Sequence, residues 1–339
     1  MKNDEKCSSF KGIRSRVVKR LNNVKTIYSR NMKRIIVSGG NGFLGSHLIS
    51  RALDEGIEVT VVDDMSTSQK INISGYAKFI KEKIENFKTD EKYDYVLHLA
   101  ARPSPEDYVE HPIDALLSNS IGTKNMLEIA LNSGGVFMYT SSSEVYGDAT
   151  MIPTPENFYG YVNPNGVRSC YDEGKRFSEA LIMAYHRKYH IDTRIQRPFN
   201  VYGPGIRPDG GYGRVIPRFI ARALMDEDIV IYGNGKQTRS FLYIDDWAEV
   251  TWKFLTSPNL EGEVINIGHS EEISILDLAQ MIKNLTGSKS RIVFEKARED
   301  DPKRRAADTT KVEKMFNWKA TVTLEEGLRI MIEWFRGRI

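Results

Sequence analysis

Cysteine is scarce in this sequence of 339 residues. The two cysteines, Cys7 and Cys170, lie far apart and lack the spacing of metal ligands. So little cysteine excludes a fold held together by disulfides and is typical of a reducing compartment. We therefore expect a cytoplasmic protein without a metal site.

Long hydrophobic runs are also missing, although 40% of the residues are hydrophobic. No apolar run approaches the roughly 18 residues that a transmembrane helix needs. No basic segment leads into a hydrophobic one as in a signal peptide. We therefore expect no integral membrane segment. The length and composition instead fit one large or two modest globular domains with a sizeable core.

The net charge is small, at +3, and it is unevenly distributed. Residues 1–31 carry nine Lys or Arg and two acidic residues, a local charge of +7, so the rest of the chain is mildly acidic. This distribution argues against a nucleic-acid partner for the body of the protein. We expect 1–31 to be a solvated basic N-terminal extension. The alternative is a short helix that contacts a membrane surface through apolar side chains three or four residues apart: Ile13, Val17, Leu21 and Val24.

A glycine-rich turn follows the first expected buried strand, residues 33–38. Three glycines stand three residues apart, and helical periodicity continues over residues 46–55. A turn of this kind lets the backbone approach a pyrophosphate closely and directs a helix N-terminus at it. We assign a dinucleotide site to the residues of the turn and of the helix start: Gly39, Gly42, Phe43, Leu44 and Gly45.

Asp63 ends the next expected strand, 58–62, eighteen residues after the last of these glycines. A carboxylate here accepts hydrogen bonds from ribose hydroxyls and repels a 2′-phosphate, so the expected cofactor is NAD rather than NADP. Leu99 and Ala100, at the end of the strand expected over 95–99, complete the cofactor-binding residues.

Strands and helices alternate along this part of the chain. Further strands are expected at 78–81, 136–140 and 193–196, and helices at 112–131 and 171–189. Such a succession predicts an α/β fold, namely a Rossmann doubly wound parallel sheet with right-handed crossovers. We assign residues 32–198 to this NAD-binding domain.

The character of the sequence changes near residue 198, where loops become frequent. Shorter elements are expected at 214–225, 229–233, 237–241, 276–285 and 323–336. We expect residues 199–339 to form mainly a smaller α/β lobe that binds the substrate over the carboxyl edge of the sheet. Arginines in this lobe are candidate ligands, because guanidinium groups match diphosphates and carboxylates: Arg239, Arg304 and Arg305.

Tyr171 and Lys175 are a candidate catalytic pair. Four residues apart in an expected helix, the phenol and the ammonium share one face, and the cation can favour a phenolate that accepts a proton from a hydroxyl. Ser142, Ser143 and Glu144 follow the strand expected at 136–140. We expect them at the carboxyl end of the sheet, where open parallel sheets bind their ligands.

These motifs resemble the extended short-chain dehydrogenase/reductase family of nucleotide-sugar enzymes, and the similarity runs from about Met32 to the C-terminus. Within the family, four segments resemble the UDP-glucuronate decarboxylases, also called UDP-xylose synthases. The segments are 143–148 (SEVYGD), 162–164 (VNP), 168–176 (RSCYDEGKR) and 300–302 (DDP).

The resemblance implies an NAD-dependent enzyme that oxidises a nucleotide sugar at C4, releases carbon dioxide from the 4-keto acid and returns the hydride. It also implies a homodimer. The catalytic residues that it implies are Ser142, Ser143, Glu144, Tyr171, Lys175 and Arg305, and Tyr171 and Lys175 also contact the cofactor. The residues that we assign to substrate binding are Asn200, Arg214, Arg239 and Arg305.

Other functions stay open. Residues 200–204 (NVYGP) are closer to the 4-epimerases of the family. The 4,6-dehydratases have an Asp-Glu pair where this chain has Ser143 and Glu144. A different class is a non-catalytic NAD-binding protein on the same fold, since a fold does not fix a function. Such a protein would retain NAD and leave every nucleotide sugar unchanged.

Overall fold

The computed structural model describes residues 32–68, 75–207, 214–297 and 302–338. The extension expected over 1–31, with Cys7, lies outside the described residues. So do the two acidic residues of the 300–302 segment.

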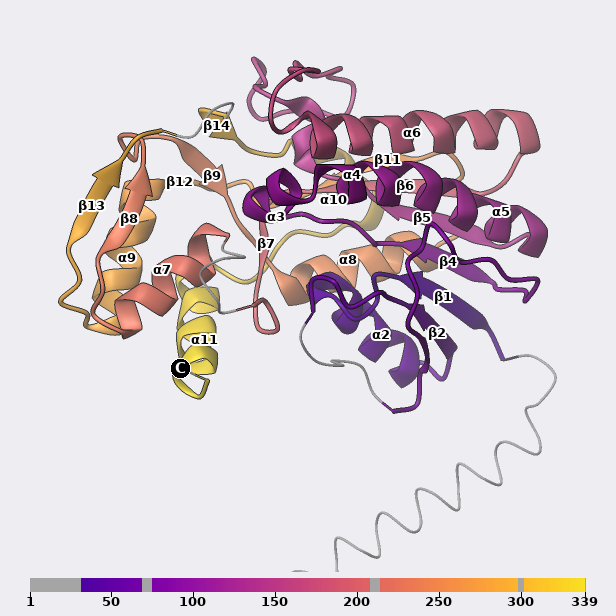
Figure 1. The fold of residues 1–339 in the computed structure, drawn as a ribbon, viewed down its shortest axis with the longest axis horizontal. Helices are drawn as coiled ribbons and strands as arrows, with labels where there is room; N and C mark the ends of the chain where they lie inside the picture. The colour runs from indigo at the N-terminus through magenta and orange to yellow at the C-terminus, as the bar shows by residue number, and fades with distance from the viewer. Residues whose placement is uncertain (1–31, 69–74, 208–213, 298–301, 339) are drawn as a thin grey trace, which may run out of the picture.

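A parallel sheet of seven strands forms the centre of the molecule, in the order β11-β6-β5-β4-β1-β2-β3 (Figure 1). The strands are β1 (Arg34–Ser38), β2 (Glu58–Val62), β3 (Lys78–Ile80), β4 (Tyr95–His98), β5 (Val136–Thr140), β6 (Thr193–Pro198) and β11 (Val264–Ile267). The order reverses at β1, which pairs with β2 on one side and β4 on the other. A reversal of this kind leaves a crevice at the carboxyl ends of the two strands. The predicted α/β doubly wound class is confirmed.

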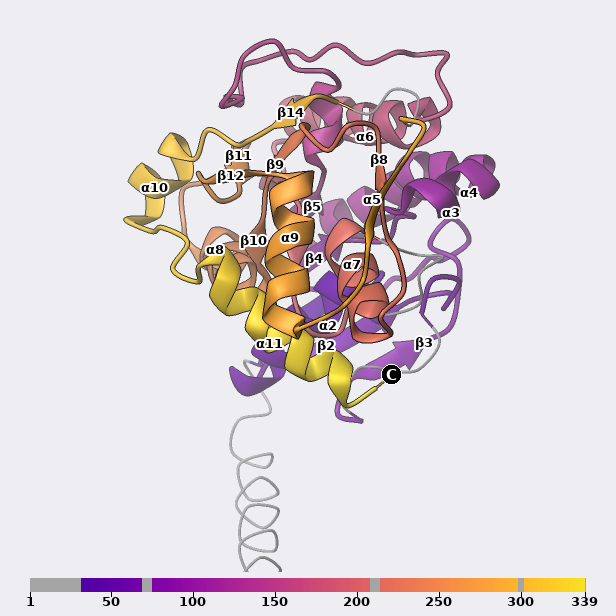
Figure 2. The same cartoon turned by 90° about the vertical axis from the view of Figure 1, so that its left-hand side faces the viewer.

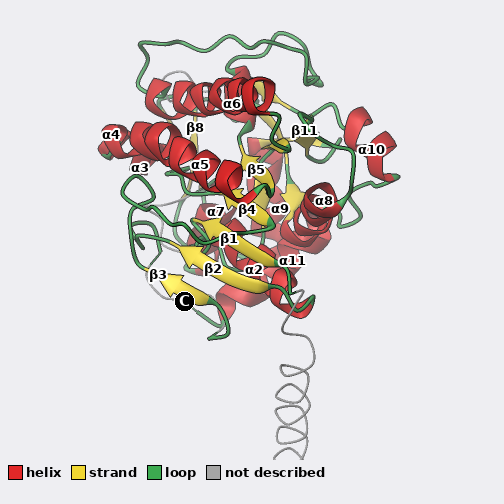
Figure 3. Cartoon of the chain, turned by 90° about the vertical axis from the view of Figure 1, so that its right-hand side faces the viewer, coloured by secondary structure: helices red, strands yellow, loops and turns green. Residues whose placement is uncertain are grey.

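Helices cover both faces of the sheet (Figure 3). One face carries α3 (Pro105–Glu110), α4 (Pro112–Leu117), α5 (Thr123–Ser133) and α6 (Ser169–Tyr189). The other carries α2 (Phe43–Asp54) and α8 (Ile244–Thr256). Each layer buries its own apolar cluster against the sheet, which provides the main hydrophobic stabilisation. None of the helices in the described part of the chain has the length and apolar character needed to cross a bilayer.

The single helix expected over 112–131 is interrupted. Between α4 and α5 the chain makes a π-helical turn, η1 (Ser118–Gly122). Asn119 in this turn is fully buried, accepts a hydrogen bond from the Tyr139 hydroxyl at 2.8 Å and donates one to the Ala115 carbonyl at 2.8 Å. The turn thus directs a polar side chain into the protein next to α6, and such turns often occur at functional sites.

A second, smaller group of helices and strands, the second lobe, lies at one end of the sheet (Figure 1), and Figure 2 shows it from the front. Its elements are α7 (Val215–Leu224), β8 (Ile229–Tyr232), β9 (Thr238–Ser240), β12 (Glu272–Ser274), α9 (Ile275–Thr286), β13 (Ile292–Glu295), β14 (Arg304–Arg305) and α11 (Leu324–Arg336). The short pair β7 (Val201–Tyr202) and β10 (Leu242–Tyr243) connects it to the sheet.

The central sheet also takes a strand from beyond residue 198. β11 pairs in parallel with β6, and α8 and α10 (Thr310–Phe316) pack beside these two strands. The chain therefore leaves the nucleotide-binding half after β6, builds part of the second lobe, returns for α8 and β11, and then completes that lobe.

Candidate active site

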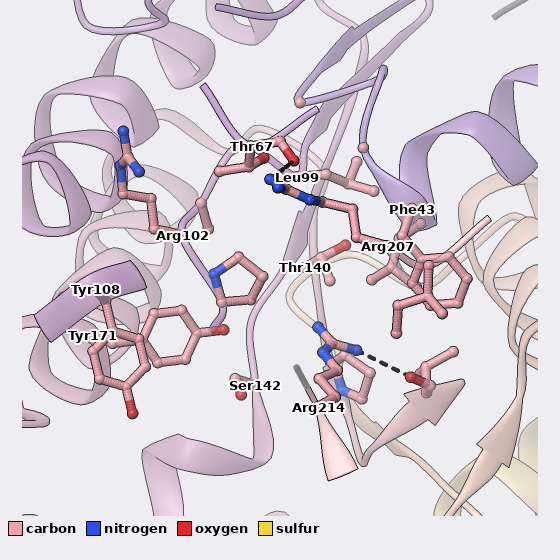
Figure 4. A pocket seen from close by; sticks show the side chains of 18 of the residues that line it. Phe43, Thr67, Leu99, Arg102, Tyr108, Thr140, Ser142, Tyr171, Arg207 and Arg214 are labelled. Atoms are coloured by element: carbon pink, nitrogen blue, oxygen red, sulfur yellow. Dashed lines mark hydrogen bonds between the residues drawn. The ribbon is translucent and has the colours of Figure 1, made fainter. Parts of the chain in front are cut away.

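A cavity of about 800 Å³ lies at the carboxyl edge of the sheet, between the two lobes. Apart from the candidate ligand Arg304, the structure brings together at its wall every residue assigned to cofactor, catalysis or substrate. Those residues are Gly39, Gly42, Phe43, Leu44, Gly45, Asp63, Leu99, Ala100, Ser142, Ser143, Glu144, Tyr171, Lys175, Asn200, Arg214, Arg239 and Arg305. Figure 4 shows one part of the wall, with Tyr108 and Tyr171 on one side, Phe43 and Arg207 on the other, and Thr67 and Ser142 between them. Their individual roles stay predictions.

The glycine turn has a shape that only glycine permits. Gly39 has φ +68°, and a Cβ there would lie 2.6 Å from the Ala100 backbone nitrogen. A Cβ on Gly45 would lie 2.6 Å from the Gly39 carbonyl oxygen. α2 begins at Phe43, three residues before the helix that periodicity predicted, because Gly42 provides the extended N-cap residue. The first amides of α2 therefore face the cavity without intrahelical partners, which is the arrangement that binds a pyrophosphate.

Asp63 lies beside this turn at the end of β2. Its carboxylate accepts hydrogen bonds from the backbone amides of Asn41, at 2.9 Å, and Met65, at 2.8 Å. Burial raises the pKa of Asp63, and these two amides oppose the rise. Two backbone donors hold the carboxylate in place at the wall of the cavity. The turn and this carboxylate fit the diphosphate and the ribose of NAD.

Tyr171 and Lys175 lie one turn apart on α6, and both side chains are buried. The Lys175 ammonium donates to the Thr140 carbonyl at 2.8 Å and lies 5.7 Å from the centre of the Tyr171 ring. Burial lowers the pKa of Lys175 to about 7. Burial raises the pKa of Tyr171 to about 12, and a side-chain hydrogen bond with Ser142 opposes that rise. In the protein alone the phenol thus stays protonated at neutral pH, because burial outweighs the lowering of its pKa by Ser142 and Arg214.

Ser142 caps the short 3-10 helix η2 (Ser143–Tyr146), which directly follows β5. The Ser142 hydroxyl accepts a hydrogen bond from the Glu144 backbone amide at 3.2 Å. This cap turns the chain at the sheet edge and holds Ser142 beside Tyr171 while Glu144 reaches across the cavity toward the second lobe.

Glu144 lies between two arginines. It forms a two-pronged ion pair with Arg305 of β14, in which Arg305 Nη2 lies 2.7 Å from Glu144 Oε2. Arg168, the N-cap residue of α6, donates from Nη2 to the same oxygen at 2.5 Å. Burial alone would raise the pKa of Glu144, but the two arginines outweigh it and hold the pKa at about 2. Glu144 is therefore ionised at every pH at which the protein is expected to work.

Two residues of the site, Arg168 and Tyr108, were not among those expected from the sequence. Arg168 precedes Tyr171 by one helical turn, so helical spacing was a signal that pointed to it. Tyr108 lies in the six-residue helix α3, which has too few residues for a periodic signal. Its ring stacks on that of Tyr171, with centroids 5.2 Å apart and planes 9° apart. Its buried hydroxyl has no hydrogen-bond partner within the described ranges and lies at the cavity wall, where a ligand can supply one.

Three further residues from beyond β6 place polar groups at the cavity wall. Asn200, at φ +42°, donates to the Ser240 carbonyl at 2.8 Å. Arg214, at the start of α7, donates to the Val201 carbonyl at 3.0 Å. Arg239 of β9 is buried and is the register partner of Arg305 on β14. The second lobe therefore presents several guanidinium groups to the cavity.

Arg304 was predicted to face a ligand together with Arg305, and this was wrong. The Arg304 guanidinium pairs with Glu272 at 2.6 Å, its side chain is 55% exposed, and it does not line the cavity. Successive residues of a strand point to opposite faces, so when Arg305 of β14 faces the cavity, Arg304 must point away.

The sequence and the fold both have known relatives. Residues 35–268 match the NAD dependent epimerase/dehydratase family. UDP-glucuronic acid decarboxylase 5 of Arabidopsis thaliana is 40% identical over 319 residues, and the match covers 92% of each chain. UDP-glucose 4-epimerase of Thermotoga maritima, solved with UDP-glucose, gives a TM-score of 0.83 at 30% identity over 90% of this chain and 99% of that one. MoeE5 in complex with UDP-glucuronic acid and NAD gives 0.81 at 28% identity, over 90% and 100%. The chain belongs to the NAD dependent epimerase/dehydratase family.

Proposed function

We propose that the protein converts UDP-glucuronate to UDP-xylose by NAD-dependent decarboxylation through a 4-keto intermediate. Relatives at 40% identity named UDP-glucuronic acid decarboxylases support this proposal. A similar fold solved with UDP-glucuronic acid and NAD supports the substrate and the cofactor.

The observation that carries the proposal is the cluster of Arg168, Glu144 and Arg305 beside Tyr171. Two guanidinium groups share one carboxylate, so the cluster has one positive charge more than it has negative charge. A buried cation that lacks an anion is costly, and a sugar carboxylate supplies that anion. A neutral sugar gives the surplus charge no partner, which favours an acidic sugar as the substrate.

Oxidation needs Tyr171 as a phenolate, so the phenol first gives its own proton to solvent, and the C4 hydroxyl then donates its proton to that phenolate. Ser142, which is hydrogen-bonded to Tyr171, holds the same oxygen. Lys175 lies beneath the phenol and stabilises negative charge on it when protonated. The glycine turn and Asp63 would hold NAD, which would supply the hydride acceptor and donor for C4.

The 4-ketone makes loss of carbon dioxide possible. The ketone is β to the C5 carboxylate, so the electrons of the breaking C5–carboxylate bond move into an enolate. Arg168 and Arg305 orient the carboxylate before this step. Glu144 is ionised and cannot itself give a proton to C5, so it orients the water that does. Tyr171 then returns its proton to the C4 oxygen.

The experiment is mass spectrometry of the nucleotide sugar after purified protein and NAD are incubated with UDP-glucuronate. We expect a product lighter by the mass of carbon dioxide. Glu144→Gln should abolish the product, whereas Glu173→Gln, which removes a 38% exposed carboxylate from α6, should leave it unchanged. An unchanged substrate with the normal protein and with added NAD would refute the proposal.

A 4-epimerase is the second candidate. It is favoured by the UDP-glucose 4-epimerase structure, which superposes on 90% of this chain. In the same assay an epimerase leaves the mass of the nucleotide sugar unchanged and produces a second isomer on chromatography. UDP-glucuronate and UDP-glucose are both tested, since either is a substrate for 4-epimerisation.

A homodimer is proposed from the exposed apolar side chains on α3, α4, η1 and α6. These elements pack on one another, and their exposed side chains include Val109, Ile113, Ile121 and Phe177. Exposed apolar surface of this kind is typical of a protein interface. Phe177→Glu should shift the protein to monomer in analytical ultracentrifugation, and Phe294→Glu, an equally exposed phenylalanine on β13, should not.

The proposed location is the cytoplasm, and the scarcity of cysteine supports it. Fractionation of cells that produce the full chain tests it. Recovery of the protein with membranes or in the medium would contradict it.

A further inference from the structure

Asp172 follows the catalytic tyrosine on α6 and points into the charged cluster. Its side chain is 8% exposed. Its Oδ1 is buried and makes no hydrogen bond to any described residue. Its Oδ2 lies 3.8 Å from Arg168 Nε, which is an ion-pair distance but too long for a hydrogen bond. The Nη2 group of the same guanidinium donates its hydrogen bond to Glu144 and not to Asp172.

The groups that face Asp172 come from three other elements and from its own helix. They are Tyr108 on α3, Glu144 on η2, Arg305 on β14, and Arg168, Cys170, Tyr171 and Glu173 at the start of α6. Two carboxylates, Glu144 and Asp172, thus compete for Arg168, and only Glu144 also holds Arg305.

A buried carboxylate without hydrogen bonds favours its neutral form. Burial and the negative charge of Glu144 raise the pKa of Asp172 to about 8, against the two arginines. At neutral pH the cluster therefore contains Arg168, Arg305 and ionised Glu144, with Asp172 protonated, and its net charge is +1. Once Asp172 ionises, the surplus positive charge disappears.

We propose that Asp172 is a positioning residue that, as a neutral carboxyl, leaves the Arg168–Glu144–Arg305 cluster one positive charge for the carboxylate of an acidic sugar. This inference rests on the proposed function and adds a residue to it. Asp172 does not touch the sugar. It acts through Arg168. When Asp172 is protonated, the positive charge of Arg168 stays available to a ligand, and when Asp172 is ionised, it neutralises that charge.

The consequence is a pH dependence that belongs to acidic sugars alone. As the pH rises through the titration of Asp172, UDP-glucuronate should lose affinity relative to UDP-glucose, which has no carboxylate at C5. The quantity to follow is the dissociation constant of UDP-glucuronate divided by that of UDP-glucose. Titration of Lys175 or of the nucleotide affects both ligands equally and cancels in this ratio. We expect the ratio to rise about tenfold from pH 6.5 to pH 9.5, as for one site that shifts by about one pKa unit.

The test is calorimetric titration of the NAD-loaded protein with each ligand, in a Tyr171→Phe background that blocks turnover. Asp172→Asn removes the titrating group at nearly constant shape, so its ratio should be flat across the range and should equal the low-pH ratio of the parent. Glu173→Gln removes the neighbouring exposed carboxylate and should retain the tenfold rise.

The Tyr171→Phe protein with Asp172 unchanged tests the inference even if Asp172→Asn does not fold. If its ratio does not change with pH, the inference is overturned. The same tenfold rise in a folded Asp172→Asn protein, one that binds UDP-glucose normally, also overturns it. These outcomes differ from failure of the proposed function. That failure appears as absence of decarboxylation by the unmodified protein, whatever the binding ratio.

Discussion

Gly39→Ala is expected to destabilise the fold and to abolish retention of NAD. Two costs act at this position. An alanine at φ +68° destabilises the folded state by about 1–2 kcal/mol, because its backbone must adopt the left-handed conformation. Its Cβ would also lie 2.6–2.9 Å from three backbone atoms of Leu99 and Ala100, which cannot rotate away, and overpacking of this kind costs about 1–3 kcal/mol. The free energy of unfolding should therefore fall by about 2–5 kcal/mol.

Alanine variants of two other glycines measure the backbone cost and the contact cost separately. Gly56 has φ +74° with no atom within 4 Å of a Cβ, so Gly56→Ala should lose only the backbone part, about 1–2 kcal/mol. Gly45 lies inside α2, and its Cβ would meet the Gly39 oxygen at 2.6 Å. Gly45→Ala should lose the contact part and regain about 1 kcal/mol of helix propensity, a net loss of about 0–2 kcal/mol.

Urea unfolding of the three variants measures these losses, and the NAD that copurifies with each is released and quantified. Only Gly39→Ala and Gly45→Ala should lose bound NAD, because Gly56 lies at the far end of α2. Equal losses of stability and equal NAD content in Gly39→Ala and Gly56→Ala would refute the reasoning, since the close approach to Ala100 would then have no energetic effect.

Further predictions concern charge and the cofactor. The pKa of Lys175 is lowered from 10.5 to about 7, so its contribution to stability is complete above pH 10.5 and is lost as the pH falls to about 7. Lys175→Met should flatten that rise of stability with pH in urea unfolding of the cofactor-free protein, and an unchanged slope would contradict it. Arg207 donates to the Thr67 carbonyl at 3.1 Å across the cavity, so Arg207→Gln should speed release of NAD in a fluorescence assay. Thr67→Ala keeps that carbonyl and should release NAD at the normal rate. Equal release rates in the two variants would mean that this hydrogen bond does not retain NAD. Arg304→Ala should leave kcat and KM for UDP-glucuronate unchanged and Arg305→Ala should lower kcat/KM at least about a hundredfold; equal effects would mean that the two arginines do not differ in orientation.

The nucleotide-binding half could be predicted because its signals are local. The glycines of the turn are three residues apart, Asp63 directly ends β2, and the strands β2 and β5 have the predicted bounds. Each depends on neighbouring residues in the chain, and periodicity and spacing describe such neighbours well.

The centre of the site depends on distant residues. Glu144 and Arg305 are 161 residues apart, and only the family resemblance suggested that they act together. Arg168 had a local signal in its helical spacing from Tyr171, whereas the stacking of Tyr108 on the same ring follows from the packing of α3 on α6. Packing between elements leaves no periodic trace in a sequence.

The secondary structure expected from the sequence was wrong or incomplete at positions where tertiary contacts determine it. The break in the helix over 112–131 occurs where Asn119 bonds to Tyr139, on a different element. The strand β11 was missed because it is four residues long and comes after a helix, α8, that was also not predicted. The orientation of Arg304 and Arg305 shows the same limit: alternation along a strand means that one of the two faces the cavity, but only the pairing of β14 with β9 fixes which one.

The cluster of Arg168, Glu144 and Arg305 also limits how this site can change. Replacing Glu144 alone leaves two buried guanidinium groups without the carboxylate that they share, and replacing either arginine alone leaves Glu144 with one arginine. Removal of one partner from a buried ion pair costs about 3–5 kcal/mol, a large fraction of the stability of a protein. A protein engineer who wants a neutral-sugar site here must therefore exchange all three residues at once. Single-residue libraries screened for a new substrate will return mostly destabilised variants from these positions.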